Sequence, residues 1–227
     1  MARFTRIQVA AMMEMKGLVP LFYHEDIDVC KNVLKAVYEG GGRLLEFTSR
    51  GDYAHEVFSE LNKYATNELP ELIVGVGSVT DAASASFYMA NGANFIVTPV
   101  FRRDIATVCN RRKVLWSPGC GSLSEIATAE EMGAEIIKVF PGSTLGPEFV
   151  RAIKGPCPWT SIMPTGGVST NKENLEAWFA AGVTCVGMGS QLITNEYLAS
   201  KNYIGIANHV SNTIAMINEI RSKLNFL

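Results

Sequence analysis

The segment EEMGAEIIKVFPG (residues 130–142) runs from the end of a helix into a strand. Gly133 can adopt the left-handed backbone conformation that commonly ends a helix. The apolar run that follows consists of strand-forming residues, and Pro141-Gly142 ends it. Such a short apolar run after a helix is typical of a parallel strand that is covered on both faces.

The same pattern occurs three more times, in VYEGGGRLLEFTSR (37–50), YMANGANFIVTP (88–99) and FAAGVTCVGMGS (179–190). Four further strands are expected at residues 18–23, 72–76, 114–117 and 161–164, and helices are expected at residues 54–66, 81–91, 122–132 and 171–180. Asp81 and Ser122 are suitable N-caps, and Glu125 would complete a capping box with Ser122. Eight strands that alternate with helices favour an α/β fold of the (β/α)8, or TIM, barrel type over an open sheet.

The two ends of the chain complete this expectation. A helix is expected before the first strand, and a long helix is expected at the end, where Ile206, Val210, Ile217 and Leu224 follow a near-helical spacing. No linker or low-complexity segment divides the chain, so residues 1–227 are interpreted as a single domain.

Composition excludes several classes of protein. The net charge of −2 argues against a nucleic-acid partner, and no apolar run is long enough for a membrane span. The five cysteines form no CxxC pair, which indicates a reducing, cytoplasmic setting. The beginning of the chain is not a convincing signal peptide, because Glu14 and Lys16 interrupt its apolar part.

Lys138 is the unusual residue of the opening segment, because lysine is rarely buried unless it is paired or used. It could extend its amine out of the strand end into solvent. Alternatively, it could be a desolvated amine that acts as a nucleophile. The segment by itself leaves both interpretations open.

Polar residues also occupy the strand of RLLEFTSR (43–50). Alternate side chains share one face of a strand, so Glu46, Thr48 and Arg50 should point the same way. They could form a local Glu46–Arg50 ion pair, or they could provide a general acid/base beside an anion-binding arginine.

Two glycine-rich turns, PTGGVST (164–170) and VGMGSQL (186–192), follow the last two expected strands. They could be ordinary tight turns, but barrels often bind phosphate at this place through backbone N–H groups. The three histidines show no metal-ligand spacing, so no metal site is expected.

Five motifs in this order resemble the 2-keto-3-deoxy-6-phosphogluconate (KDPG) and 4-hydroxy-2-oxoglutarate (KHG) aldolase family. They are LEFTSR (45–50), GVGSV (75–79), KVFP (138–141), PTGG (164–167) and GMGS (187–190), and together they span most of the chain. The resemblance implies a class I, Schiff-base aldolase on a small barrel that needs no metal or organic cofactor. It implies a keto acid and a phosphorylated aldehyde as small-molecule partners, and a homotrimer as the assembly.

The resemblance also implies a role for individual residues. Lys138 would form the Schiff base, Glu46 would be the general acid/base, and Phe140 would pack on the imine. The residues that would bind the rest of the substrate are Arg50 and Ser78 (pyruvyl carboxylate), Thr98 and Pro99 (the end of the fourth strand), Thr165 (hydroxyls), and Gly166, Gly167, Gly189 and Ser190 (phosphate).

Three positions depart from the family pattern. Ser78 stands where threonine is more usual, Val100 stands where the family has glycine, and Ser49 replaces a large apolar residue. The last two leave the aldehyde half of the substrate open. The alternatives to an aldolase are a phosphate-binding barrel with other chemistry, such as an epimerase or a thiamine-phosphate synthase, and a non-catalytic sugar-phosphate-binding protein.

Overall fold

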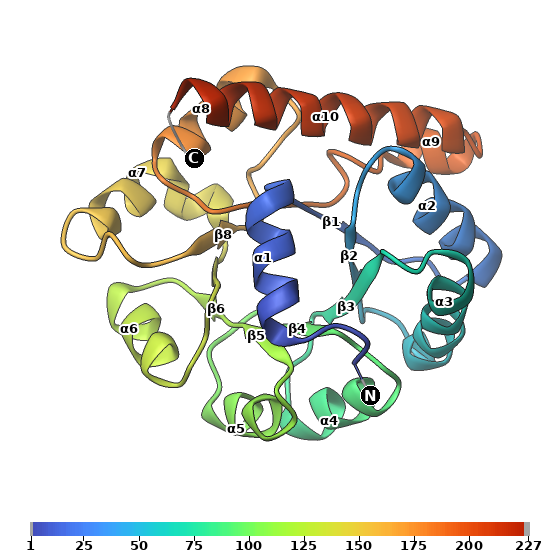
Figure 1. The fold of residues 1–227 in the computed structure, drawn as a ribbon, viewed down its shortest axis with the longest axis horizontal. Coiled ribbons are helices and arrows are strands. Elements are labelled where there is room, and N and C mark those ends of the chain that lie inside the picture. Colours follow the sequence, from blue (N-terminus) through green and yellow to red (C-terminus); the bar gives the residue numbers. More distant parts are fainter. Residues whose placement is uncertain (1, 225–227) are drawn as a thin grey trace.

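Strands and helices alternate along the chain in the computed structural model of the protein, which describes residues 2–224 (Figure 1). The strands are β1 (Leu18–Phe22), β2 (Leu44–Thr48), β3 (Ile73–Gly77), β4 (Phe95–Val97), β5 (Leu115–Ser117), β6 (Gly119–Cys120), β7 (Ile137–Val139), β8 (Ile162–Pro164) and β9 (Val186–Met188). The helices are α1 (Arg6–Lys16), α2 (Ile27–Glu39), α3 (Ala54–Glu68), α4 (Ala82–Ala90), α5 (Arg103–Arg112), α6 (Leu123–Glu131), α7 (Gly142–Lys154), α8 (Lys172–Ala180), α9 (Asn195–Ala199) and α10 (Tyr203–Lys223). The expected α/β alternation is confirmed.

Glycines end the helices before β2, β4, β7 and β9, as the repeated pattern predicts. Gly41, Gly92, Gly133 and Gly182 all have positive φ, between 84° and 94°. The N–H of Gly133 donates to the carbonyl of Glu130 at 2.8 Å, which closes the last turn of α6. Each glycine therefore turns the chain directly from a helix into the next strand.

The predicted N-caps are also present. Asp81 and Ser122 accept hydrogen bonds from backbone N–H groups in the first turns of α4 and α6. The Glu125 carboxylate bonds the Ser122 hydroxyl at 3.0 Å and the N–H of Gly121 at 2.8 Å. The capping box is thus shifted by one residue from the expected form, in which Glu125 would accept from the N–H of Ser122.

All strand pairs are parallel, and they form a curled sheet in two hydrogen-bonded parts. The orders are β5-β4-β3-β2-β1-β9 and β6-β7-β8. The strand expected at residues 114–117 continues into β6, and Pro118 interrupts it because proline has no N–H to donate. The Pro118 carbonyl still accepts from the N–H of Lys138 at 2.9 Å, and one bridge, Thr165–Gly187, lies between the ends of β8 and β9.

The core has an inner and an outer part. Val9 and Met13 of α1 pack into the inner cluster, so α1 covers the amino ends of the strands, in front of them in Figure 1. The other inner residues come from the strands or the positions just before them: Val19, Leu44, Ile73, Phe95, Val97, Leu115, Ile136, Met163 and Cys185. The outer cluster fills the space between the strands and the surrounding helices. Because α1 covers the amino ends of the strands, we expect a functional site at their carboxyl ends.

The expected long final helix is α10, which crosses the top of Figure 1 and packs on α2, α8 and α9. Ile206, Val210 and Ile217 are buried, as their spacing predicts. Leu224 is not buried with them: it is the C-cap and is 40% exposed. Within residues 2–224, no helix combines the length and the apolar character needed to span a bilayer.

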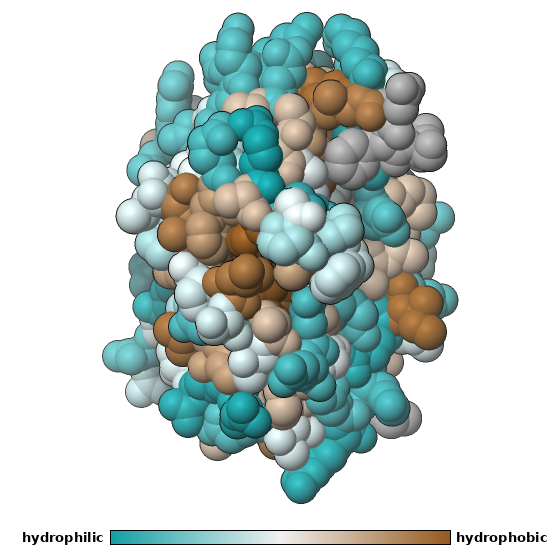
Figure 2. All heavy atoms as spheres, turned by 90° about the vertical axis from the view of Figure 1, so that its left-hand side faces the viewer, coloured by the Kyte–Doolittle hydropathy of each residue, from teal (hydrophilic) through white to brown (hydrophobic). Residues whose placement is uncertain are grey.

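One side of the molecule carries apolar side chains at its surface. Figure 2 shows the face on the left of Figure 1, where α6 and α7 lie, with an apolar patch surrounded by polar residues. Leu123 of α6 is 40% exposed, and Leu145 and Phe149 of α7 are half-buried. These helices therefore offer apolar surface for contact with another molecule.

Candidate active site

Lys138 points into the interior of the curled sheet. Its neighbours Ile137 and Val139 pack in the outer cluster and Ile136 packs in the inner one, so the alternation of β7 turns Lys138 inward. The residue is only 5% exposed, and its Nζ lies 4.8 Å from the centroid of the Phe140 ring. The amine is therefore buried and does not extend into solvent.

Burial lowers the pKa of the Lys138 amine below its ordinary value of 10.5. The positive charge of Arg50 acts in the same direction, whereas the negative charge of Glu46 opposes it. Burial dominates because water no longer stabilises the ammonium form. A larger share of this lysine is consequently the neutral, nucleophilic amine near neutral pH.

Glu46 is the second buried ionisable residue of the interior. Leu45 and Phe47 face the outer cluster, so Glu46 of β2 faces inward, and it is 1% exposed. Neither carboxylate oxygen has a hydrogen-bond partner among the described residues. Burial raises the pKa of this carboxyl group, while Lys138 and Arg50 counteract part of that rise.

The position of Glu46 depends on β3, which pairs with β2. A Cβ atom at Gly77 would overlap the Glu46 carboxylate, so the side chain lies over the bare backbone of that glycine. The interior opposite Lys138 is thus occupied by a carboxyl group that can accept or donate a proton.

A cavity of about 480 Å³ opens at the carboxyl ends of β1, β2, β8 and β9. It is lined by seven of the residues expected to bind substrate: Arg50, Phe140, Thr165, Gly166, Gly167, Gly189 and Ser190. Lys138 and Glu46 do not line it. Phe140 and Thr48, each two residues further along the chain, do line it, so the lysine and the glutamate lie one step deeper.

The two glycine-rich turns form one wall of this cavity. Gly166 and Gly167 have φ values of 83° and 73°, which other residues adopt only with strain. The backbone of Ser143 leaves no room for a side chain at Gly167, where a Cβ atom would lie 2.7 Å from its Cα. This packing keeps the turn close to the beginning of α7.

A histidine of α10 connects the segments that follow these two turns. Its Nδ1 lies 3.0 Å from the carbonyl oxygen of Leu192, and its Nε2 lies 3.2 Å from the Thr170 hydroxyl. Through these contacts, His209 holds the segments after β8 and β9 in a fixed relation to each other.

Thr165 lies between the deep residues and this wall. It is 9% exposed, and its hydroxyl has no partner among residues 2–224. A Cβ atom at Gly187 would lie 2.5 Å from this hydroxyl, so the glycine makes room for it. An unpartnered hydroxyl at the edge of the cavity is available to a bound molecule.

A family model for KDPG and KHG aldolases matches residues 9–209. The chain belongs to this aldolase family. A KDPG aldolase from Pseudoalteromonas atlantica is 30% identical over 199 residues, which are 87% of this chain and 90% of the relative. A 2-dehydro-3-deoxy-6-phosphogalactonate aldolase from Escherichia coli is 35% identical over 129 residues, 53% of this chain and 58% of the relative.

Solved structures of the aldolase family share the fold. The KDPG aldolase of Legionella pneumophila, solved with pyruvate captured as a covalent carbinolamine intermediate, superimposes with a TM-score of 0.81 at 25% identity. The match covers 90% of this chain and 97% of that one.

Three residues expected to bind substrate lie outside the cavity of this aldolase. Ser78 follows β3 with φ of 60°, a left-handed conformation that is uncommon for serine. Thr98 is fully buried and donates its hydroxyl to the Val100 carbonyl at 2.7 Å, and Pro99 is half-buried beside it. Their roles in substrate binding remain predictions.

The departures from the aldolase family pattern also lie away from the cavity. The Ser49 hydroxyl bonds the hydroxyl of Tyr88 at 2.6 Å, and Val100 is 51% exposed. Neither side chain lines the cavity. These two departures therefore do not reduce the volume of the cavity.

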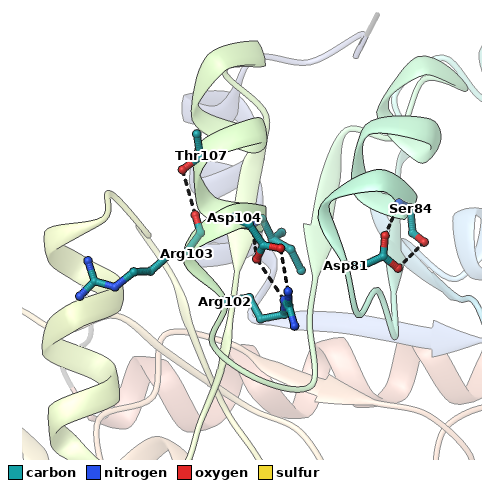
Figure 3. A network of polar contacts seen from close by, with 7 residues as sticks. Asp81, Ser84, Arg102, Arg103, Asp104 and Thr107 are labelled. Carbon is teal, nitrogen blue, oxygen red and sulfur yellow. Dashed lines mark hydrogen bonds and ion pairs between the residues drawn. The ribbon is translucent and has the colours of Figure 1, made fainter.

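The residues after Val100 form a polar network of their own. Figure 3 shows Arg102 paired with Asp104, at 2.7 Å, while Arg103 extends away from that pair. In the same view, Asp81 accepts hydrogen bonds from the N–H and the hydroxyl of Ser84 at the beginning of α4. Arg102 is thus engaged locally and does not reach into the cavity.

Sequence reasoning missed several polar residues of the site. Tyr23, Gln191 and Asn195 line the cavity, and Ser117 is fully buried with a hydroxyl that has no partner among the described residues. Tyr23 ends the first expected strand, so its place at a strand end was an available signal. No group of three His, Cys, Asp or Glu residues in the described part of the chain is arranged to hold a metal ion.

Proposed function

We propose that the chain is a class I aldolase that reversibly cleaves a 2-keto-3-deoxy-6-phospho sugar acid to pyruvate and glyceraldehyde 3-phosphate. The observation that carries this proposal is the buried amine of Lys138, with its lowered pKa, facing the same interior as the unpartnered carboxyl group of Glu46. Membership of the aldolase family supports it. Cleavage of 4-hydroxy-2-oxoglutarate to pyruvate and glyoxylate is proposed as a second activity.

The chemistry begins at Lys138. Its neutral amine attacks the C2 keto group of the substrate, and the resulting carbinolamine loses water to give a protonated imine. When the C4 hydroxyl loses its proton, the C3–C4 bond breaks and its electrons move toward the imine nitrogen. The aldehyde leaves, and an enamine remains on the lysine.

Glu46 moves the protons in these steps. Because its pKa is raised, it holds a proton up to a higher pH than an ordinary carboxyl group and can release it again, as a general acid and base must. Acting through a water molecule, it gives its proton to the departing hydroxyl of the carbinolamine and then accepts the proton of the C4 hydroxyl when the C3–C4 bond breaks. The same proton is then delivered to C3 of the enamine. Hydrolysis of the new imine then releases pyruvate and restores the amine of Lys138.

The remaining residues would bind the substrate. We assign the pyruvyl carboxylate to Arg50 and Ser78, the face of the imine to Phe140, and a hydroxyl to Thr165. We assign the phosphate to the turns of Gly166, Gly167, Gly189 and Ser190, whose backbone N–H groups suit an anion. Thr98 and Pro99 would shape the site from β4. The proposed steps require no cofactor or metal.

We also propose that the parallel sheet of this chain closes into a barrel. Residues 1–227 would form one (β/α)8 barrel domain, closed through the β5–β6 strand and the contact between β8 and β9.

A homotrimer would use apolar surface such as the patch on α6 and α7. A cytoplasmic location is supported by five cysteines that are all free. Sedimentation at working concentration tests the trimer, and a pure monomer would contradict it.

Release of pyruvate from the phosphorylated sugar acid tests the activity. Coupling to lactate dehydrogenase makes each turnover visible as loss of NADH. We expect turnover by the protein and none by its Lys138→Met variant. Full turnover by that variant would favour a phosphate-binding barrel with other chemistry. Binding of the sugar acid without any turnover would favour a non-catalytic sugar-phosphate-binding protein.

A further inference from the structure

Tyr23 follows β1 and lies on the wall of the cavity. β1 is hydrogen-bonded to β2 on one side and to β9 on the other. Its end therefore lies between Arg50, which follows β2, and the Gly189-Ser190 turn, which follows β9. A substrate that reaches from the arginine to the glycine-rich turns passes this tyrosine.

Packing holds the Tyr23 ring in place. The ring meets the Phe47 ring edge-on, with centroids 5.5 Å apart and planes at 63°. A Cβ atom at Gly51 would overlap the phenol oxygen, so the hydroxyl occupies space that only a glycine leaves open there. The position of the hydroxyl is thus defined by its neighbours before any ligand binds.

The Tyr23 hydroxyl is free to bond a ligand. None of the residues 2–224 forms a hydrogen bond with it. Burial raises the pKa of the phenol, and the nearby ionisable groups of Glu25, Cys30 and Asp52 raise it further. The group therefore remains a neutral O–H donor throughout the physiological pH range.

We propose that Tyr23 is a specificity-determining residue, whose hydroxyl donates a hydrogen bond to an oxygen in the aldehyde half of the phosphorylated sugar acid. This inference rests on the proposed aldolase function. Tyr23 lines the cavity, whereas Lys138 and Glu46, which would act on the pyruvyl half, lie deeper than the cavity wall. The contact serves the half of the substrate that leaves as aldehyde.

The test compares two reactions of Tyr23→Phe, which removes only the hydroxyl. We expect kcat/KM for 2-keto-3-deoxy-6-phosphogluconate to fall about tenfold, the loss that one hydrogen bond to a ligand causes. The rate at which borohydride traps pyruvate on the enzyme should stay unchanged, because pyruvate lacks the aldehyde half. This unchanged rate also reports that the interior of the variant is folded.

The matched control is Tyr38→Phe, which removes a surface hydroxyl 3.2 Å from the Glu71 carboxylate and should change neither reaction. An unchanged kcat/KM in Tyr23→Phe would overturn the inference, and so would a parallel loss of pyruvate trapping, which would place the contact on the pyruvyl half. Failure of the unmodified protein to trap pyruvate would instead refute the aldolase function itself. The two proposals therefore fail in different ways.

Discussion

The Glu46 carboxylate lies over the backbone of Gly77, where any side chain would overlap it. β3 thus carries glycine on its inner face because β2 places a carboxyl group there. The carboxyl group is fixed in position without a single hydrogen bond from the described residues, which leaves both oxygens available for proton transfer.

This relationship predicts the effect of Gly77→Ala. The added methyl group must displace the Glu46 carboxylate, and a displacement of about 1 Å can cost about 100-fold in rate. We expect pyruvate release to fall by that order. The control is Gly155→Ala, because Gly155 has helical φ and ψ and its Cβ atom would meet only an oxygen at 3.5 Å. Unchanged activity in Gly77→Ala would show that the position of the carboxylate does not matter.

The raised pKa of Glu46 predicts a pH-dependent gain of stability in Glu46→Gln. Below the ordinary carboxyl pKa of 4.5, the group is protonated in both the folded and the unfolded chain. As the pH rises above this value, the unfolded chain releases its proton first, so the folded protein loses stability relative to the variant. Urea unfolding at pH 4 and pH 7 should show a larger advantage of Glu46→Gln at pH 7. Glu68→Gln, an exposed change at the end of α3, is the control. A stability advantage of Glu46→Gln that shrinks toward pH 7 would contradict a raised pKa of Glu46 in the folded protein.

Arg50 should influence both the amine and the substrate. Its charge helps to lower the pKa of Lys138, so Arg50→Gln should move the inflection of the pH profile of pyruvate trapping to higher pH. The same change should raise the pyruvate concentration needed for half-maximal trapping, because the carboxylate of pyruvate loses the guanidinium group that would bind it. Arg50→Lys keeps the charge, so it should retain the inflection while still weakening pyruvate binding. An identical pH profile in Arg50→Gln would exclude the electrostatic role.

Ser190 should distinguish phosphorylated from unphosphorylated substrates. If its turn binds phosphate, Ser190→Ala should raise KM for the phosphorylated sugar acid about tenfold, since a hydrogen bond to a charged group is lost. KM for 4-hydroxy-2-oxoglutarate, which has no phosphate, should not change. Ser222→Ala on the surface of α10 serves as control. Equal changes in KM for both substrates would argue against phosphate binding by this turn.

The order of strands and helices could be predicted from the sequence because local signals agree. Gly133 and its three equivalents end helices, and the apolar runs after them form strands. The interruption at Pro118 was harder to foresee, since a proline at a strand end and one within a strand look alike in the sequence.

The candidate site could be predicted in part. Strand alternation placed Glu46 and Arg50 together, and the family motifs pointed to Lys138 and the glycine-rich turns. Tyr23 was missed because its importance depends on β1 lying between β2 and β9, a relationship of strands far apart in the sequence. The sequence also did not reveal that Thr98 lies outside the cavity and donates its hydroxyl to the Val100 carbonyl.

Intact-mass analysis after incubation with pyruvate and borohydride, followed by peptide mapping, tests the Schiff-base assignment most directly. The account predicts one reduced pyruvyl adduct per chain, located on Lys138 and absent from Lys138→Met. An unmodified mass on folded protein, or an adduct on any other lysine, would contradict it.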